Sequence, residues 1–291
     1  MRFEGDAAPR FAVGTVIRNG LSVVSQNFFR FFGILLAVGV STIFLIALAG
    51  MMLERGAQTG GSIGDFRFAS RGDLVVFVVI FAVVTAVAYF VTQAAIAYGT
   101  LQTLRGREAG VGACFSQAFA ALPRLFLAGL VLFAVGVVIA LVAGLALAAV
   151  QSTPAPGATA TRGVTAAAAV IMLLMLAVAL YCVALIWVFV PAAMVERAGP
   201  IACLRRSLEL TRGRRWTVFG IVLLIFVTNV VASSITRLMA QHGAPLGGAA
   251  LNLLVAALFT ALSGVLPAIG YAYLRAEKEG AGIDDVVKVF D

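Results

Sequence analysis

The sequence predicts an all-α fold: a polytopic membrane protein with six transmembrane helices and cytoplasmic amphipathic helices. Three observations carry this prediction. Of the 291 residues, 62% are hydrophobic and 12% are charged, a balance that a soluble domain cannot bury. Six runs of more than 20 residues contain no Asp, Glu, Lys or Arg. The 21 basic residues gather in alternate connections between those runs.

The uncharged runs cover residues 31–53, 74–104, 125–150, 164–195, 216–236 and 243–274. Because an unpaired amide in hydrocarbon is costly, each run is expected to close its own hydrogen bonds as a helix. The longer runs exceed the roughly 30 Å of the hydrocarbon core and must tilt, bend or project beyond it. Pro191 and Pro267 lie near the C-terminal ends of two long runs, where we expect a bend. A broken transporter helix is the alternative at these prolines.

The distribution of basic residues predicts the topology. Sixteen of the 21 fall in the N-terminal arm, the second and fourth connections and the tail, and five fall in the other three connections. Loops rich in Arg and Lys stay in the cytoplasm, so both termini are expected there.

Three amphipathic segments each precede a shorter span, which precedes a longer one. Their apolar faces are listed in chain order: Val13, Ile17, Leu21, Val24 and Phe28; then Val111, Cys114, Phe115, Ala118, Phe119 and Leu122; then Ile201, Leu204, Leu208 and Thr211. This order predicts a single membrane domain, 1–291, built from three repeats of about ninety residues. The repeats cover 9–105, 109–197 and 199–275, and residues 276–291 form a cytoplasmic tail. An ordinary alternation of spans and basic loops is the competing interpretation.

The third amphipathic segment holds the densest group of arginines. Pro200 suits its first turn and Gly213 its end, so we expect a short helix along the membrane surface. Each basic side chain near an anionic membrane contributes about 1 kcal/mol of attraction. Anionic lipid headgroups, rather than nucleic acid, are therefore the expected partner of five arginines: Arg205, Arg206, Arg212, Arg214 and Arg215.

The spans offer few groups for chemistry. None contains an ionisable Asp, Glu, Lys or Arg, which argues against a proton-coupled transporter. Tyr89, Gln93, Asn229 and Asn252 are candidate polar intramembrane positions, either for packing hydrogen bonds or for a polar pathway.

No catalytic motif is present, so we expect no enzyme activity and no cofactor. Glu196 is interpreted as a partner in a structural salt bridge. Three cysteines without CxxC spacing and a single histidine, His242, predict neither a metal site nor a disulfide framework.

The chain resembles a known family over most of its length, through one recognisable pattern. The pattern consists of Pro191, Glu196, Gly199, Ala202, Leu204, Ser207, Leu210, Thr211, Gly213 and Trp216, with FAVGTVIRNGLSVVSQNFFRFF before the first span. It resembles the bacterial integral-membrane family typified by the glycerophosphoryl diester phosphodiesterase membrane domain. The resemblance implies six spans in a bacterial plasma (inner) membrane. Some members carry a soluble phosphodiesterase domain, but only 16 residues follow Arg275, so we expect no such domain here and carry over no hydrolysis.

The sequence therefore predicts a non-enzymatic membrane domain that engages anionic lipid headgroups or partner proteins at its cytoplasmic face. A homo-oligomer is a further possible assembly. The alternative function is a transporter or channel component for a small or lipid-like solute.

Overall fold

The computed structural model describes residues 11–53, 71–151, 158–196, 199–241 and 245–279. Within these ranges the regular structure is entirely α-helical. The helices are α1 (Val13–Gln26), α2 (Phe28–Leu53), α3 (Arg71–Leu104), α4 (Val111–Gln151), α5 (Ala158–Leu185), α6 (Phe189–Glu196), α7 (Pro200–Thr211), α8 (Arg215–Gln241) and α9 (Pro245–Glu279). Six stretches are long and apolar enough to cross a membrane, which confirms the all-α, six-span prediction.

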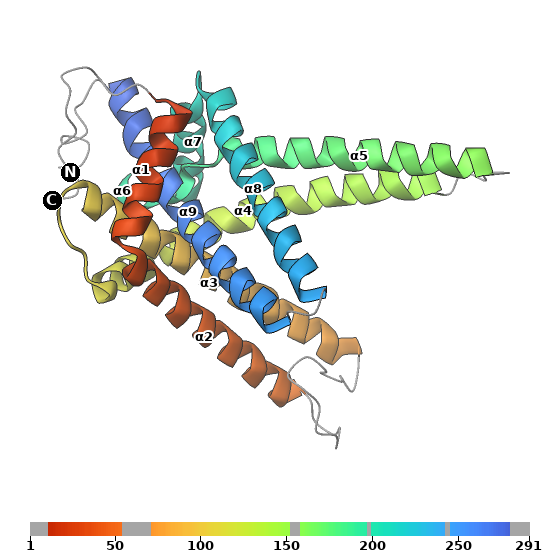
Figure 1. Ribbon diagram of the computed structural model, residues 1–291, viewed down its shortest axis with the longest axis horizontal. Coiled ribbons are helices and arrows are strands. Elements are labelled where there is room, and N and C mark those ends of the chain that lie inside the picture. Colours follow the sequence, from red (N-terminus) through yellow and green to blue (C-terminus); the bar gives the residue numbers. More distant parts are fainter. Residues whose placement is uncertain (1–10, 54–70, 152–157, 197–198, 242–244, 280–291) are drawn as a thin grey trace.

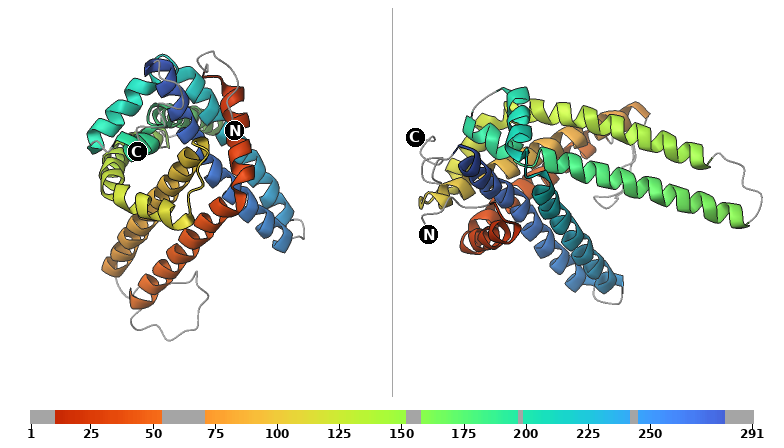
Figure 2. Two further views of the ribbon diagram at one scale, coloured as in Figure 1. Left: turned by 90° about the vertical axis from the view of Figure 1, so that its left-hand side faces the viewer. Right: turned by 90° about the horizontal axis from the view of Figure 1, so that it is seen from above.

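Three helical hairpins diverge from one end of the molecule (Figure 1). The pairs α2–α3, α4–α5 and α8–α9 each pack side by side, and α4–α5 points away from the other two. Helices α1, α6 and α7 gather with the adjoining ends of α3, α4, α8 and α9, and we call this assembly the hub (Figure 2). The hub joins three arms that each carry two candidate spans.

Burial separates the hub from the arms. On α9, residues 264–274 are all buried in the hub, whereas Leu253 and Leu254 are 64% and 53% exposed on the arm. The same division appears on α3, where residues 90–97 are buried but Val75, Val78 and Val79 are exposed. Large apolar side chains exposed along entire helices are the expected surface of a protein whose surrounding solvent is lipid.

Helix α1 lies against α9 through small and polar contacts. The side-chain amide of Asn19 donates to the Tyr273 hydroxyl at 2.8 Å. A Cβ on Gly20 would lie 2.4 Å from Leu266 Cδ2, so only glycine allows this approach. Of the apolar face predicted for this segment, Val24 is buried and Val13 packs partly buried against the core, whereas Leu21 and Phe28 are exposed. The buried Gly20 is not part of that predicted face, although it contacts α9.

The middle amphipathic segment is not a separate helix. Helix α4 runs unbroken from Val111 to Gln151, with Pro123 inside it. Cys114 and Ala118 are fully buried as predicted, but Phe119 is 56% exposed. After α7, Gly213 adopts the left-handed conformation, with φ +91°, which is typical of a residue that ends a helix. Between residues 111 and 151 every residue is helical, so no glycine ends a helix there.

The fourth span is interrupted rather than merely bent. Helix α5 ends at Leu185, residues 186–188 form a turn, and α6 begins at Phe189. Pro191 has no N–H to give to the carbonyl of Trp187, four residues before it. Instead the Phe189 N–H bonds the Ile186 carbonyl at 3.0 Å. The prediction of a continuous bent helix was therefore wrong at Pro191, whereas Pro267 lies inside the continuous helix α9.

Hydroxyl groups from α7 compensate for this break. The Ser207 hydroxyl donates to the Leu185 carbonyl at 3.1 Å, and the Thr211 hydroxyl lies 3.5 Å from the same oxygen. Both side chains are completely buried. A backbone carbonyl freed from its helix needs such a partner where water is excluded. Helix α7 is thereby fixed against the end of the fourth span.

Candidate functional site

Helix α7 is the element that positions the predicted arginines. It begins at Pro200 in the first turn, as expected, and stops just before Gly213. Its inward face consists of Cys203, Ser207, Leu210 and Thr211, each at most 1% exposed. Small side chains dominate this face, because α7 must come close enough for its hydroxyls to reach the interrupted span.

The opposite face of α7 combines apolar and cationic side chains. Ile201, Arg205, Leu208 and Arg212 follow one another at spacings of four, three and four residues, which places them in one stripe. All four are exposed, and Ile201 is 72% exposed. Ile201 and Leu208 of the predicted apolar face are therefore exposed, Leu204 is half-buried and Thr211 is buried.

Trp216 continues this surface onto the first turn of α8. Its side chain is 78% exposed. Its ring packs edge-to-face on Phe219 with centroids 5.9 Å apart, and lies 6.1 Å from the ring of Tyr181. Exposed tryptophan beside arginine is typical of the region where a membrane protein meets lipid headgroups. We call the set Ile201, Arg205, Leu208, Arg212, Arg215 and Trp216 the α7–α8 face.

Two of the five predicted arginines are held by internal ion pairs. Arg206 Nε lies 2.8 Å from Glu196 Oε1, and its guanidinium also pairs with Glu279. Arg214 pairs with Glu277, at 3.1 Å from its Nε atom. The structural salt bridge predicted for Glu196 is confirmed.

The Arg206 pair belongs to a larger network in the hub. The Tyr271 hydroxyl donates to Glu196 Oε1 at 3.0 Å, and Arg275 Nε lies 2.7 Å from Glu279 Oε2. Burial lowers the pKa of Arg206, but the carboxylates of Glu196 and Glu279 outweigh burial and hold it above its ordinary value. We call Glu196, Arg206, Tyr271, Arg275 and Glu279 the hub network. Sequence reasoning missed the α9 members, because nothing local indicates that α9 returns beside α6 and α7.

The other three predicted arginines remain at the surface. Arg205 pairs with Glu209 on its own helix, at 3.1 Å, and its side chain is 81% exposed. Arg212 is exposed, and its side chain has no partner among the residues that the structure describes. Arg215 is half-buried, and its Nε atom is buried without a hydrogen-bond partner in the same part of the chain. The cations of Arg205 and Arg212 are thus exposed to an external anion, and that of Arg215 is partly exposed.

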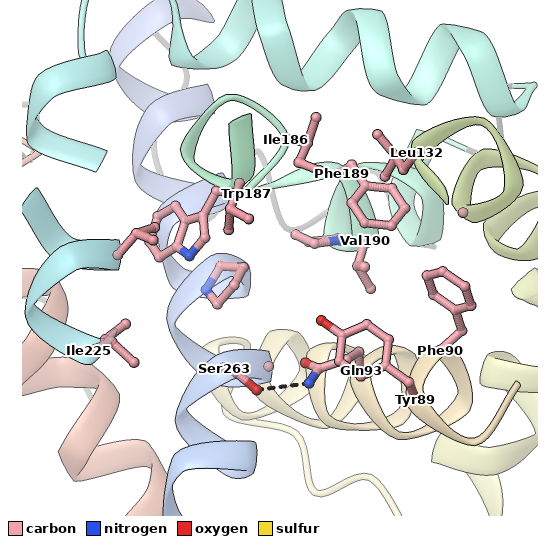
Figure 3. A pocket seen from close by; sticks show the side chains of 16 residues that line it. Tyr89, Phe90, Gln93, Leu132, Ile186, Trp187, Phe189, Val190, Ile225 and Ser263 are labelled. Carbon is pink, nitrogen blue, oxygen red and sulfur yellow. Dashed lines mark hydrogen bonds between the residues drawn. The ribbon is translucent and has the colours of Figure 1, made fainter. Parts of the chain in front are cut away.

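The four candidate intramembrane positions do not come together. Tyr89 and Gln93, one turn apart on α3, line a cavity of about 340 Å³ (Figure 3). The Gln93 side-chain N–H donates to the Ser263 hydroxyl at 2.8 Å. Asn229 and Asn252 do not line this cavity; Asn252 is exposed, and its Oδ1 accepts from the Thr236 hydroxyl at 3.4 Å.

Metal chemistry finds no support in the described part of the chain. There, no group of three or more His, Cys, Asp or Glu side chains is placed to hold a metal ion. His242 lies outside the described residues.

The Cys203 thiol lies on the inward face of α7. Burial raises the pKa of this thiol, Arg124 lowers that pKa, and Glu196 raises it.

The fold defines the class of protein: a multi-pass α-helical membrane protein whose three arms join in a hub at one end. Residues 11–277 match the family model described as Domain of unknown function (DUF7847), and the chain belongs to that family. No curated protein and no solved structure matches the chain. The matching family description does not mention a glycerophosphoryl diester phosphodiesterase membrane domain, so that resemblance stays a prediction.

Proposed function

We propose that this protein is a non-enzymatic domain of a bacterial inner membrane that engages anionic lipid headgroups through its α7–α8 face. The hub then lies on the cytoplasmic side, as the distribution of basic residues predicts. The single observation that carries the proposal is the exposed stripe on α7, in which Ile201 and Leu208 alternate with Arg205 and Arg212. A helix lying in the headgroup region needs apolar side chains to enter the acyl boundary and cations to meet phosphates.

The internal ion pairs distinguish the arginines that are free to bind lipid headgroups from those that are paired within the hub. Arg206 and Arg214 have carboxylate partners within the hub, so their charges are already balanced. Arg205 has only an exposed pair on its own helix, which contributes little and exchanges easily for a phosphate. Arg205, Arg212 and Arg215 are therefore the headgroup-binding residues of the proposal.

The test replaces these three arginines with glutamine in one variant. Purified protein is reconstituted with equal amounts of phosphatidylglycerol and phosphatidylcholine, extracted in mild detergent, and its retained lipids are counted by mass spectrometry. We expect phosphatidylglycerol to be enriched on the natural protein. Each lost arginine should reduce that enrichment by roughly fivefold, the equivalent of about 1 kcal/mol.

A matched control removes the same charge elsewhere. Arg18, Arg107 and Arg237 are exposed and lie outside the α7–α8 face. Their triple glutamine variant should keep the enrichment. Equal losses in the two variants would show a general charge effect and count against a specific face.

One observation favours the alternative function, a transporter of a lipid-like solute. The interrupted fourth span borders the 340 Å³ cavity, and interrupted helices at membrane depth commonly line substrate sites. Vesicles containing the protein and a fluorescent phospholipid would test it. Faster transfer of that lipid between leaflets than in protein-free vesicles would favour transport over headgroup binding alone.

A further inference from the structure

The cavity next to the interrupted span is the second unassigned feature of the molecule. It has a volume of about 340 Å³, and its lining comes from α3, α4, α5, α6, α8, α9 and the turn between α5 and α6. This volume lies within the range of small-molecule binding pockets, about 300–1,000 Å³. In Figure 3 the side chains of Ile186, Phe189 and Leu132 face those of Tyr89, Gln93 and Ser263 across the open space.

The lining is apolar with a neutral polar margin. None of the sixteen described residues that line the cavity is charged. The polar margin contains Tyr89, Gln93 and Ser263, and most of the remaining lining residues are aliphatic or aromatic. Gln93 is 3% exposed, and its hydrogen bond with Ser263 uses only one of its two N–H groups. The Tyr89 hydroxyl has no hydrogen-bond partner among the described residues, so it is a second available donor.

The position of the cavity indicates what can reach it. On α4, Leu125 and Ala128 are fully buried on the hub side, while Leu130 and Phe133 are 55% and 67% exposed on the arm side. In the cavity wall, Gly129 lies between the buried and the exposed pair, and Leu132 lies between Leu130 and Phe133.

The same transition occurs on α9 and α3. On α9, Ser263 follows the exposed Leu253 and Leu254 and directly precedes the buried hub segment, and Pro267 lies within that segment. Tyr89 is itself 55% exposed, just before the buried stretch of α3. The cavity therefore lies where the lipid-facing segments of these helices enter the hub.

We propose that this cavity binds one acyl chain of a membrane phospholipid, whose ester carbonyl accepts hydrogen bonds from Tyr89 and Gln93. The apolar wall removes the chain from contact with neighbouring lipids, and the neutral donors suit an uncharged ester rather than a phosphate. The interrupted span supports this assignment, because irregular backbone at membrane depth occurs where it borders a cavity. The proposal does not depend on the α7–α8 face, because no arginine lines the cavity.

The experiment uses a zwitterionic phosphatidylcholine with a photoreactive diazirine in the middle of one acyl chain. The whole protein is reconstituted with this lipid, illuminated, digested and mapped by mass spectrometry. We expect labelled peptides from the cavity wall, centred on residues 186–191 and 263–267. Labelling spread evenly over the exposed arms, with none on these peptides, would overturn the proposal.

A matched pair of substitutions on α4 tests occupancy. Leu132→Trp places a larger side chain, with an indole ring, in the cavity. Leu130→Trp adds the same ring on the exposed surface outside the cavity. We expect Leu132→Trp to reduce labelling of the cavity peptides about tenfold, which corresponds to about 1.4 kcal/mol, and Leu130→Trp to leave it unchanged. Unchanged labelling in folded Leu132→Trp would contradict an acyl chain in this space.

A second pair keeps the test decisive if Leu132→Trp does not fold. Ile225→Trp enters the cavity from α8, and Leu224→Trp is its exposed control. Gln93→Leu should shift labelling to neighbouring residues of the cavity wall without abolishing it, because it removes a donor to the ester but adds apolar surface. The triple arginine variant should label normally, so failure of the headgroup proposal and failure of this one are distinguishable.

Discussion

The hub and the three arms are built from similar helices but are stabilised differently. In the hub, residues 264–274 of α9 are buried by other helices, and five polar side chains form the hub network. In the arms, the same helix exposes Leu253 and Leu254. Association between helices in lipid gains little from apolar burial, because lipid tails are as apolar as leucine. The tertiary structure therefore depends mainly on the hub, and changes in the arms should matter less.

The largest difference is expected between two leucines of one helix. Leu266→Ala in the hub removes a side chain that is 1% exposed and packs against Gly20 of α1. It should lower the free energy of unfolding by about 3 kcal/mol, because a cavity remains. Leu254→Ala on the arm, at 53% exposure, should cost about 0.5 kcal/mol. Unfolding of both variants in detergent micelles measures the difference, and equal losses would break the distinction between hub and arms.

A second comparison separates the half-buried ion pairs of Arg206 from the exposed ion pair of Arg205 on α7. Arg206→Gln leaves Glu196 and Glu279 without their shared cation, and should cost about 2 kcal/mol. Arg205→Gln removes only the exposed pair with Glu209 and should cost less than about 0.5 kcal/mol. A double-mutant cycle with Glu196→Gln gives the coupling energy in the hub network. Additive effects in that cycle would show that the ion pair contributes nothing of its own.

The sequence was sufficient for the spans and for the ends of α7, because lipid imposes a strong constraint. A run without charges must form a helix whatever it packs against, so six spans follow from composition. Pro200 and Gly213 mark the ends of α7 by local backbone rules that need no tertiary information. The salt bridge of Glu196 was also predictable, because arginines follow it closely in the chain.

The packing faces were not predictable by the same reasoning. Hydropathy assigns Ile201 and Leu208 to the interior, but an exposed apolar side chain has no penalty beside a membrane. Ser207 and Thr211 look like surface residues, yet they are buried because the broken span supplies an acceptor for them. No sequence signal before Pro191 indicates that the span stops as early as Leu185. Contacts between elements far apart in the chain decided each of these points.

A smaller effect is expected where the hub meets the interrupted span. Ser207→Ala removes the hydroxyl that donates to the Leu185 carbonyl at 3.1 Å and should cost about 1 kcal/mol. The control Ser234→Ala, on the exposed surface of α8, removes only a bond to the Val230 carbonyl of its own helix and should be nearly neutral. The readout is unfolding in micelles, combined with hydrogen exchange at residues 186–189. A loss of global stability without faster hydrogen exchange at residues 186–189 would mean that Ser207 does not stabilise the interrupted span.

At neutral pH the smallest effect is that of the Cys203 thiol in the hub, which changes stability only as the pH rises. Burial raises the pKa of the Cys203 thiol, so above about pH 9 the unfolded chain loses this proton before the folded protein does. The folded state then binds more protons, and its stability falls as the pH rises. Cys203→Ala and Cys203→Ser should both make this fall less steep, by up to about 1.4 kcal/mol per pH unit. Because other titrating groups are the same in each protein, the difference between the unfolding curves from pH 8 to pH 10.5 isolates the thiol. Parallel curves would mean that Cys203 ionises equally easily in the folded hub and in the unfolded chain, and that this part of the hub is open to water.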